Sequence, residues 1–298
     1  MKCFVFAIAA ALLSAAPAFA QGWGMEGAAR HPQAMGIIEY QSRDWAQCAG
    51  EEEIAPQRAI SACGRIIGER ISRDITASAY FYRSELYAQI GDAQRADADV
   101  ARSVGLLVEL AQVEPDNADY ASNLAYLRGK MGDFAGGAAD FTRLVALRPQ
   151  AIEHRIRQAD FFFRARDFVS AAAAFDAAAQ LDPTNAAVQA GRCEARAAAN
   201  REIEVATEAC AEAVRLTNDS SSALFSRGYL NFMQGRIEDA LADFRAAGEK
   251  DNTNPYAAYG YGVVSIRLGR EERGRALIAQ VTEAVPDVEA YANAGLRP

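Results

Sequence analysis

The sequence predicts an all-α protein in which antiparallel helix pairs repeat along the chain. Turn residues recur at a pitch of about 34 residues, each interval holds two amphipathic segments, and small residues occupy fixed positions in both segments. An ordinary helical bundle would not require a constant pitch. The repeat therefore decides the fold class before any single motif is considered.

The pitch is set by proline and asparagine residues at the predicted ends of helices. Proline cannot continue a helix, so each of these positions predicts a helix end. The steps between them are 34 residues, with one step of 35: Pro115, Pro149, Pro183, Asn218, Asn252 and Pro286. One inserted residue near "NREIEVA" accounts for the longer step.

A short turn divides each repeat into two helical segments. These turns read "IGDAQ", "MGDFA", "ARDFV", "QGRIE" and "LGREE". Glycine can adopt the left-handed conformation that ends the first helix. The aspartate that follows in the first three turns, Asp92, Asp133 and Asp167, can cap the second helix.

Small residues form two columns, which we expect to meet where the two helices of a repeat cross, because close approach needs small side chains. The first-helix column is Ser84, Ala125, Ala159, Cys193, Gly228 and Gly262. The second-helix column is Ala96, Gly137, Ala171, Ala206, Ala240 and Gly274. Four residues after the second column a larger core residue follows: Phe141, Phe175, Cys210, Phe244 and Ile278.

The small, phenylalanine and proline columns resemble the tetratricopeptide repeat family over about residues 74–290. The chain departs from the family pattern at the leading aromatic position of each repeat. The resemblance implies a right-handed superhelical solenoid whose concave face is lined by the first helices. We expect a signal peptide (1–20), an extended segment (21–35), a degenerate disulfide-stapled repeat (36–73), a solenoid of about six repeats (74–286) and a C-terminal capping helix (287–298).

The first 20 residues are typical of an export signal. "MKCFVFAIAAALLSAAPAFA" has one basic residue, a short apolar run and an Ala-x-Ala site, which predicts cleavage after Ala20. The apolar run is too short for a membrane span. We therefore expect a periplasmic or secreted protein of a Gram-negative bacterium with no membrane insertion. The net charge of −8 makes nucleic acid a poor candidate partner.

Four cysteines remain after cleavage, an even number for an oxidising compartment. Cys48 and Cys63 flank the turn of the first repeat, and Cys193 and Cys210 flank the turn of a later one. These positions face each other in an antiparallel helix pair, so two disulfides are predicted. A zinc site is the weaker alternative because only His31 and His154 could complete one, and a redox pair would more typically be Cys-x-x-Cys.

Nothing in the sequence predicts an enzyme. It lacks a glycine-rich phosphate loop, a His-Glu-x-x-His zinc motif and a Gly-x-Ser-x-Gly nucleophile motif. His154 lies beside several arginines, which offer it no orienting carboxylate, and His31 lies in the segment after the signal peptide. No catalytic residue, metal or cofactor is expected.

The concave face that the family resemblance implies carries aromatic and basic candidates for partner binding. The aromatic candidates are Phe163, Phe225, Tyr229, Phe232, Tyr256 and Tyr259. Phe225, Tyr229 and Phe232 share one helical face and, if exposed, suit a peptide or helix; packing between repeats is the alternative. The basic candidates, Arg155, Arg157 and Arg164, could receive an acidic segment or pair with nearby acids such as Asp160.

The sequence thus predicts a non-catalytic scaffold or adaptor that binds a segment of another envelope protein in its concave groove. A second copy of the chain is a further possible partner. The alternative function is a small-ligand or glycan-binding protein that uses the same aromatic floor.

Overall fold

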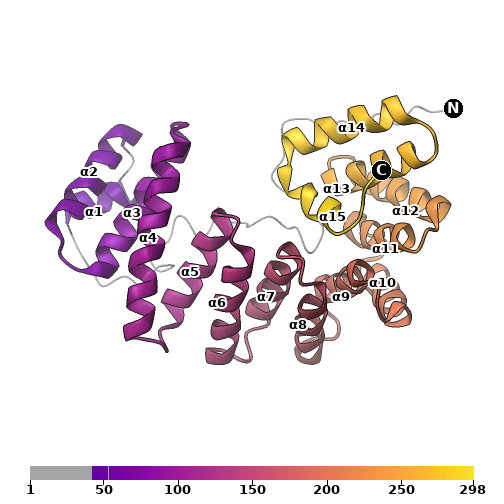
Figure 1. Cartoon of the computed structure of the whole chain (residues 1–298), viewed down its shortest axis with the longest axis horizontal. Helices are drawn as coiled ribbons and strands as arrows, with labels where there is room; N and C mark the ends of the chain where they lie inside the picture. Colours follow the sequence, from indigo (N-terminus) through magenta and orange to yellow (C-terminus); the bar gives the residue numbers. More distant parts are fainter. Residues whose placement is uncertain (1–41, 53) are drawn as a thin grey trace. The chain divides into compact units, whose positions relative to one another are not determined.

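The computed structural model describes residues 42–52 and 54–298, and every regular element among them is helical (Figure 1). The all-α fold class predicted from the repeat is confirmed. The signal peptide, the extended segment and the beginning of the first repeat lie outside the described residues. No helix in the described part of the chain is long and apolar enough to cross a membrane.

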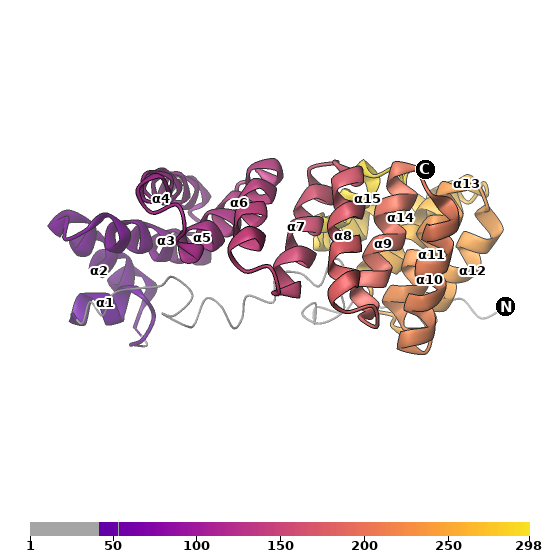
Figure 2. The same ribbon diagram turned by 90° about the horizontal axis from the view of Figure 1, so that it is seen from below.

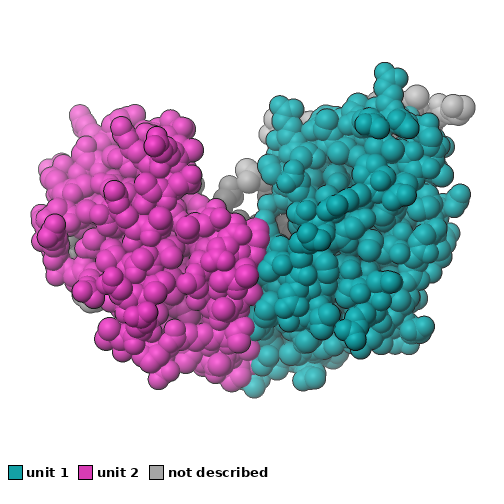
Figure 3. Space-filling model, in the orientation of Figure 1, with its two compact units in different colours: residues 1–23, 150–298 teal, residues 24–149 magenta. Residues whose placement is uncertain are grey.

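The described residues form two compact units, an N-terminal unit (residues 42–149) and a C-terminal unit (150–298), coloured separately in Figure 3. The N-terminal unit contains α1 (Arg43–Cys48), α2 (Pro56–Glu69), α3 (Arg73–Gln89), α4 (Ala93–Val113), α5 (Ala118–Lys130) and α6 (Phe134–Leu147). The C-terminal unit contains α7 (Ile152–Arg164), α8 (Phe168–Leu181), α9 (Ala186–Ala199), α10 (Ile203–Thr217), α11 (Ser221–Met233), α12 (Ile237–Lys250), α13 (Pro255–Arg267), α14 (Glu271–Ala284), the 3-10 helix η2 (Pro286–Val288) and α15 (Glu289–Asn293).

Consecutive helices pack as pairs, and within each unit the pairs stack on one another. Figure 2 shows this arrangement for α7 to α10, which lie side by side. The proline ladder marks helix ends as predicted: Pro115, Pro149 and Pro183 each stand two residues after the last residue of α4, α6 and α8. The helix α4, with 21 residues, is longer than its counterparts.

Side chains cap the helices at repeating positions. Asp92, Asp133 and Asp167 each accept a hydrogen bond from a backbone N–H in the first turn of the following second helix, which confirms the predicted caps. The first helices α5, α9 and α13 are capped by asparagines that stand two residues after a ladder position, Asn117, Asn185 and Asn254. We did not predict these asparagine caps, although their constant offset from the ladder is visible in the sequence.

The two small-residue columns meet as predicted. A β-carbon added to Gly274 on α14 would lie 2.6 Å from the carbonyl oxygen of Gly262 on α13, so this crossing has no room for a side chain. Phe244 of α12 fits between two glycines on neighbouring first helices, Gly228 and Gly260, and a β-carbon at either would lie within 2.8 Å of its ring. The phenylalanine of one repeat therefore needs a glycine in the next.

Arginines of first helices form ion pairs with buried aspartates of second helices. In α3–α4 and α11–α12 the partners are 16 residues apart: Arg83 contacts Asp99 at 2.6 Å and Arg227 contacts Asp243 at 2.6 Å. Arg128 of α5 contacts Asp140 of α6 at 2.7 Å. In each case the aspartate directly precedes the core residue of the second helix. Such buried charges need a partner, so these pairs restrict how the helices align.

Both predicted cysteine pairings occur in the structure. Cys48 of α1 is bonded to Cys63 of α2, with α-carbons 4.8 Å apart, and Cys193 of α9 is bonded to Cys210 of α10, with α-carbons 5.2 Å apart. All four residues are almost completely buried. Each disulfide closes one helix pair, which is the position of a staple and not of a reactive centre.

Candidate functional site

The C-terminal unit has a groove lined by its first helices, and the end of the chain lies in it. Residues 286–297, here called the C-terminal segment, leave α14 through Val285 and turn back through η2 and α15 (Figure 1). Four side chains of the segment are directed inward and almost completely buried: Val288, Tyr291, Ala294 and Leu296. The groove is thus filled by a short peptide of the same chain.

Tyr291 is the centre of this contact. Its ring packs edge-on against Phe225 of α11 with centroids 4.8 Å apart, and against Tyr229 one turn further at 5.4 Å. Phe163 of α7 and Tyr256 of α13 each lie 5.6 Å from the same ring. We call these four residues the tyrosine socket. Aromatic pairs at such distances are favourable beyond their burial in area alone.

Polar contacts fix the C-terminal segment at both its side chains and its backbone. The Tyr291 hydroxyl donates a 2.6 Å hydrogen bond to the carboxylate of Glu194 on α9, and the Ser226 hydroxyl of α11 donates to the same carboxylate. The Tyr229 hydroxyl donates to the backbone carbonyl of Ala294 at 2.7 Å.

Two further contacts hold the ends of the segment. The Tyr259 hydroxyl of α13 donates to the Leu296 carbonyl at 3.4 Å, near the chain end. Arg164, at the end of α7, forms an ion pair of 2.8 Å with Asp287 at the start of the segment. The segment is therefore bound along its whole length, from η2 to the residues after α15.

Two carboxyl groups are buried beneath the C-terminal segment. Burial raises the pKa of Glu194 to about 7, against the hydrogen bonds from Ser226 and Tyr291, which favour its charged form. Burial also raises the pKa of Asp160 on α7 to about 6, although the nearby Arg164 and Arg157 oppose this effect. The same burial holds the pKa values of the Tyr229 and Tyr291 hydroxyls well above their ordinary range. The groove floor is thus apolar with an acidic, readily neutralised centre.

Five of the six predicted aromatic candidates contact the C-terminal segment, Phe232 belongs to the same apolar core, and none of the six is exposed. Phe225 and Tyr229 are 0% exposed, and the most exposed of the six, Phe232, is only 7% exposed. The sequence left open whether these residues are exposed or packed; here they are packed, because the C-terminal segment and the neighbouring repeats cover them. Replacing Phe225 and Tyr229 with serine would therefore disturb the core as well as the groove.

The basic candidates all lie on α7 and are half-buried. Arg164 contacts the C-terminal segment through Asp287, and Arg157 lies near the buried Asp160. Arg155 is on the same helix, three residues after its start. An acidic residue does dock on this cluster, but it belongs to the chain itself.

The sequence did not single out the polar centre of the groove. Glu194 is the only acidic residue in the alanine-rich run "GRCEARAAA" of α9, and this isolation is the one signal that could have marked it. Ser226 and Tyr291 carry no comparable signal. Tyr291 stands in the predicted capping helix, whose position in the groove no sequence pattern reveals.

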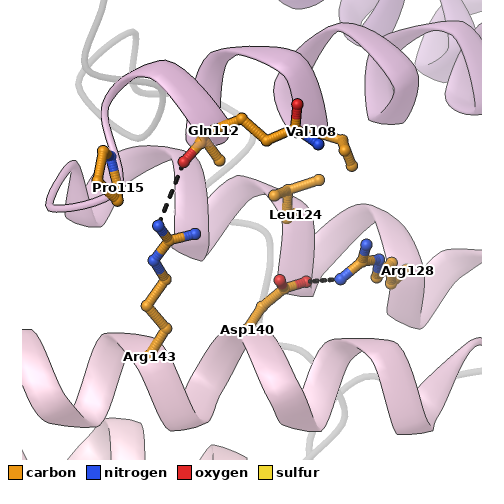
Figure 4. Close-up of a pocket in the computed structure, with 8 residues that line it drawn as sticks. Val108, Gln112, Pro115, Leu124, Arg128, Asp140 and Arg143 are labelled. Atoms are coloured by element: carbon orange, nitrogen blue, oxygen red, sulfur yellow. Dashed lines mark hydrogen bonds and ion pairs between the residues drawn. The ribbon is translucent and has the colours of Figure 1, made fainter.

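The N-terminal unit has several surface hollows, and the charges and walls of two of them bear on its function. One, of about 280 Å³, lies between α4, α5 and α6 and is drawn in Figure 4. Arg128 there pairs with Asp140, and Arg143 donates to the backbone carbonyl of Ala111 at 3.2 Å. Burial raises the pKa of Asp140 to about 6. The hollow's charged groups satisfy each other, which indicates helix alignment, not ligand binding.

The larger hollow, of about 600 Å³, lies between α2, α3 and α4. Arg73 at its edge pairs with Glu109 at 3.1 Å, and the Arg102 guanidinium lies over the Tyr80 ring. Its walls are largely exposed. Among the described residues, no group of histidine, cysteine, aspartate and glutamate side chains is arranged to hold a metal ion.

Comparisons with known proteins agree with the helix-pair repeat. Two family models, both described as tetratricopeptide repeat, match residues 122–186, 195–255 and 231–295, together more than half of the chain. A comparison with curated proteins gave no match.

Among solved structures, a tetratricopeptide repeat protein from Parabacteroides merdae ATCC 43184 is similar with a TM-score of 0.61, at 12% identity over 78% of this chain and 90% of that one. A MamA fragment from Desulfovibrio magneticus RS-1 matches at 18% identity over 59% of this chain and 96% of that one, with a TM-score of 0.46. A thermophilic protein from Thermus thermophilus matches at 16% identity over 64% and 99%, also with a TM-score of 0.46. The first likeness supports the fold alone.

Proposed function

Because this chain belongs to the tetratricopeptide repeat family, whose members are typically non-catalytic protein-interaction scaffolds, we propose that it is an adaptor that binds a segment of another protein in the groove of its C-terminal unit. The single observation that carries this proposal is the occupied groove. Residues 286–297 lie in it as a short peptide, held by the tyrosine socket, by Glu194 and by hydroxyl groups that reach its backbone carbonyls. A groove that binds one peptide in this way has the chemistry to bind another.

The proposed location is the bacterial periplasm or the medium, after cleavage near Ala20. The predicted export signal supports it, and so do the two buried disulfides, which persist in oxidising compartments. The protein would act there without inserting into the membrane and without a cofactor. The proposed partner is another envelope protein.

A small-ligand or glycan-binding protein is the second candidate. Aromatic side chains suit sugar rings as well as peptides, and this was the reason to consider it from the sequence. The contacts support the peptide, because the hydroxyls of Tyr229 and Tyr259 donate to peptide carbonyls and the aromatic side chains of the groove are buried.

The test is affinity capture of the tagged mature protein from native envelope extract after mild cross-linking. Wild type should be compared with Tyr291→Ala, which weakens the hold of the C-terminal segment, and with Tyr261→Ala, a half-buried tyrosine on α13 outside the socket. A partner captured more strongly by Tyr291→Ala than by either other protein supports groove binding. Equal capture by all three would place the partner elsewhere, and no specific capture would favour the small-ligand alternative.

A further inference from the structure

We propose that the C-terminal segment is an internal stand-in for the partner, and that the partner is a peptide with an anchoring tyrosine, a small residue three positions later and an aliphatic residue five positions later. The partner binds by displacing residues 286–297 from the groove. This inference rests on the proposed function, because it names the partner chemistry of the same groove.

The tyrosine socket is specific for tyrosine and not only for an aromatic ring. Four aromatic side chains surround the Tyr291 ring, while its hydroxyl reaches a carboxylate that is completely buried. A phenylalanine in the same place would leave Glu194 with Ser226 as its remaining hydroxyl donor. Sites that bind a buried hydroxyl in this way reject the analogue that lacks it. The partner therefore carries tyrosine at this position.

The other hydrogen bonds to the segment recognise its backbone and do not select its side chains. The hydroxyls of Tyr229 and Tyr259 bind backbone carbonyls, which every peptide has. Side-chain selection remains at the three other buried positions: Val288, three residues before Tyr291, and Ala294 and Leu296, three and five residues after it. Gly295 between them has φ +106°, and a β-carbon there would lie 2.9 Å from the Met233 methyl group, so glycine is favoured at the fourth position.

Charge selects the other end of the peptide. Asp287 stands four residues before Tyr291 and pairs with Arg164 at 2.8 Å. Arg157, on the same helix, lies close to the buried Asp160, as Arg164 does. An acidic residue four positions before the anchor completes the pattern, which is Asp-Val-x-x-Tyr-x-x-Ala-Gly-Leu.

The C-terminal segment can leave the groove without breaking a helix pair. Its buried positions alternate with exposed ones, because Glu289, Asn293 and Gly295 face outward. A single residue, Val285, connects it to α14. It therefore forms an outer layer on first helices that are already paired with α8, α10, α12 and α14. A tethered segment competes at a high effective concentration, on the order of millimolar. Wild-type protein should consequently bind the free peptide weakly.

The first experiment uses the full-length mature chain and a fluorescent peptide, PDVEAYANAGLRP, which copies residues 286–298. Tyr291→Ala should bind this peptide at least tenfold more tightly than wild type, because its own segment has lost the anchor. The same peptide with phenylalanine in place of tyrosine should bind Tyr291→Ala at least tenfold more weakly. Equal binding by both proteins, or equal binding of both peptides, overturns the proposal.

The second experiment keeps the proposal testable if Tyr291→Ala does not fold, because it uses wild-type protein alone. Millimolar peptide should accelerate hydrogen exchange of the amides in residues 289–296 and leave α8 and α12 unchanged, whereas the phenylalanine peptide should not. No acceleration overturns the displacement. A micromolar wild-type dimer that the peptide dissociates would also overturn it, since the occupant would then be a second copy.

Failure here is distinguishable from failure of the adaptor function. Both peptide experiments use purified protein and need no partner. If envelope capture succeeds but the captured protein is not released by the tyrosine peptide, the adaptor function stands and the inference falls. If the peptide binds as expected but no partner is captured, the groove recognises tyrosine peptides and the adaptor function falls.

Discussion

Tyr291 and Glu194 are 97 residues apart in sequence and are joined by a 2.6 Å hydrogen bond in the centre of the groove. The bond links the last helix of the chain to the first helix of a repeat three pairs earlier. Both residues are almost completely buried, so each depends on the other for a polar partner. Several of the expected properties of this protein follow from that dependence.

Replacing Tyr291 with phenylalanine should lower the free energy of unfolding by about 1–3 kcal/mol. The ring still fills the tyrosine socket, but Glu194 loses one of its two hydroxyl donors in a buried site. Urea denaturation measures this change in the free energy of unfolding. Tyr261→Phe, at a half-buried position outside the socket, is the matched control; an equal effect at both tyrosines would contradict a special role for the bond.

The stability of the C-terminal unit should fall as pH rises from about 4.5 to about 7. Glu194 has an ordinary pKa of 4.5 when unfolded, and burial raises its pKa to about 7 in the fold. The folded state therefore holds a proton that the unfolded state has already lost in this range. The stabilisation that Glu194 contributes is complete below its unfolded pKa of 4.5 and is lost as the pH rises through its folded pKa of about 7.

Glu194→Gln isolates this effect from other titrating groups. The groups that face Glu194 are Asp160 from α7, Ser226 and Tyr229 from α11, and Tyr291 from α15. Asp160 is also buried with a raised pKa, so the wild-type slope has two sources. The variant should gain stability relative to wild type between pH 5 and pH 8, measured by thermal unfolding. A constant difference across that range would show that Glu194 does not titrate there.

Arg166→Gly should stabilise the protein by about 0.5–1 kcal/mol. Arg166 has φ +65° in the turn between α7 and α8, where the equivalent turns have glycines with φ between +73° and +79°. A side chain in this left-handed conformation costs about 1–2 kcal/mol, partly offset by the greater flexibility of unfolded glycine. Gly132→Ala is the reverse control, since nothing lies within 4 Å of its added β-carbon, and it should destabilise. An unchanged melting temperature in both variants would count against backbone strain.

Gly260→Ala should destabilise the C-terminal unit by about 1–3 kcal/mol, because the new methyl group would overlap the Phe244 ring at 2.7 Å. Phe244→Leu should remove the overlap at the cost of a smaller core side chain. The double variant should therefore lose less unfolding free energy than the sum of the losses in the two single variants. A double-mutant cycle based on urea denaturation measures this difference. Simple additivity would mean that the glycine is not required by this phenylalanine.

Reduction should lower the melting temperature, with each disulfide worth roughly 3 kcal/mol in the chain-entropy model. All four sulfur atoms are buried, so native protein should not react with a thiol reagent until it is reduced and unfolded. The variants Cys48→Ser/Cys63→Ser and Cys193→Ser/Cys210→Ser separate the contributions. Free thiols in untreated native protein would contradict the pairing.

Much of the fold could be predicted because it is local and repeated. The ladder from Pro115 to Pro286 and the turn glycines fix where helices end, since the physical reason for each acts within a few residues. The columns that meet at Gly262 and Gly274 follow from the same pitch. The ion pair of Arg227 and Asp243 was missed, although the sequence shows the same 16-residue spacing at Arg83 and Asp99.

The candidate site was predicted only in part. The aromatic candidates were correctly assigned to first helices. The sequence left their exposure open, because exposure depends on what else lies against them. Nothing in the local pattern of residues 286–297 shows that this segment turns back after Val285. Glu194 likewise became notable only when Ser226 and Tyr291 were found around its carboxylate.

The sequence by itself determined that this chain is a stack of helix pairs, closed by two disulfides, because caps, turns and small-residue crossings act over short distances along the chain. Only the tertiary structure decided that the groove is occupied and that a tyrosine and a buried glutamate meet at its centre. That contact joins residues 97 positions apart. It arises from apolar burial and hydrogen bonding between the C-terminal segment and the first helices, whose relative positions cannot be read from the spacing of the repeats.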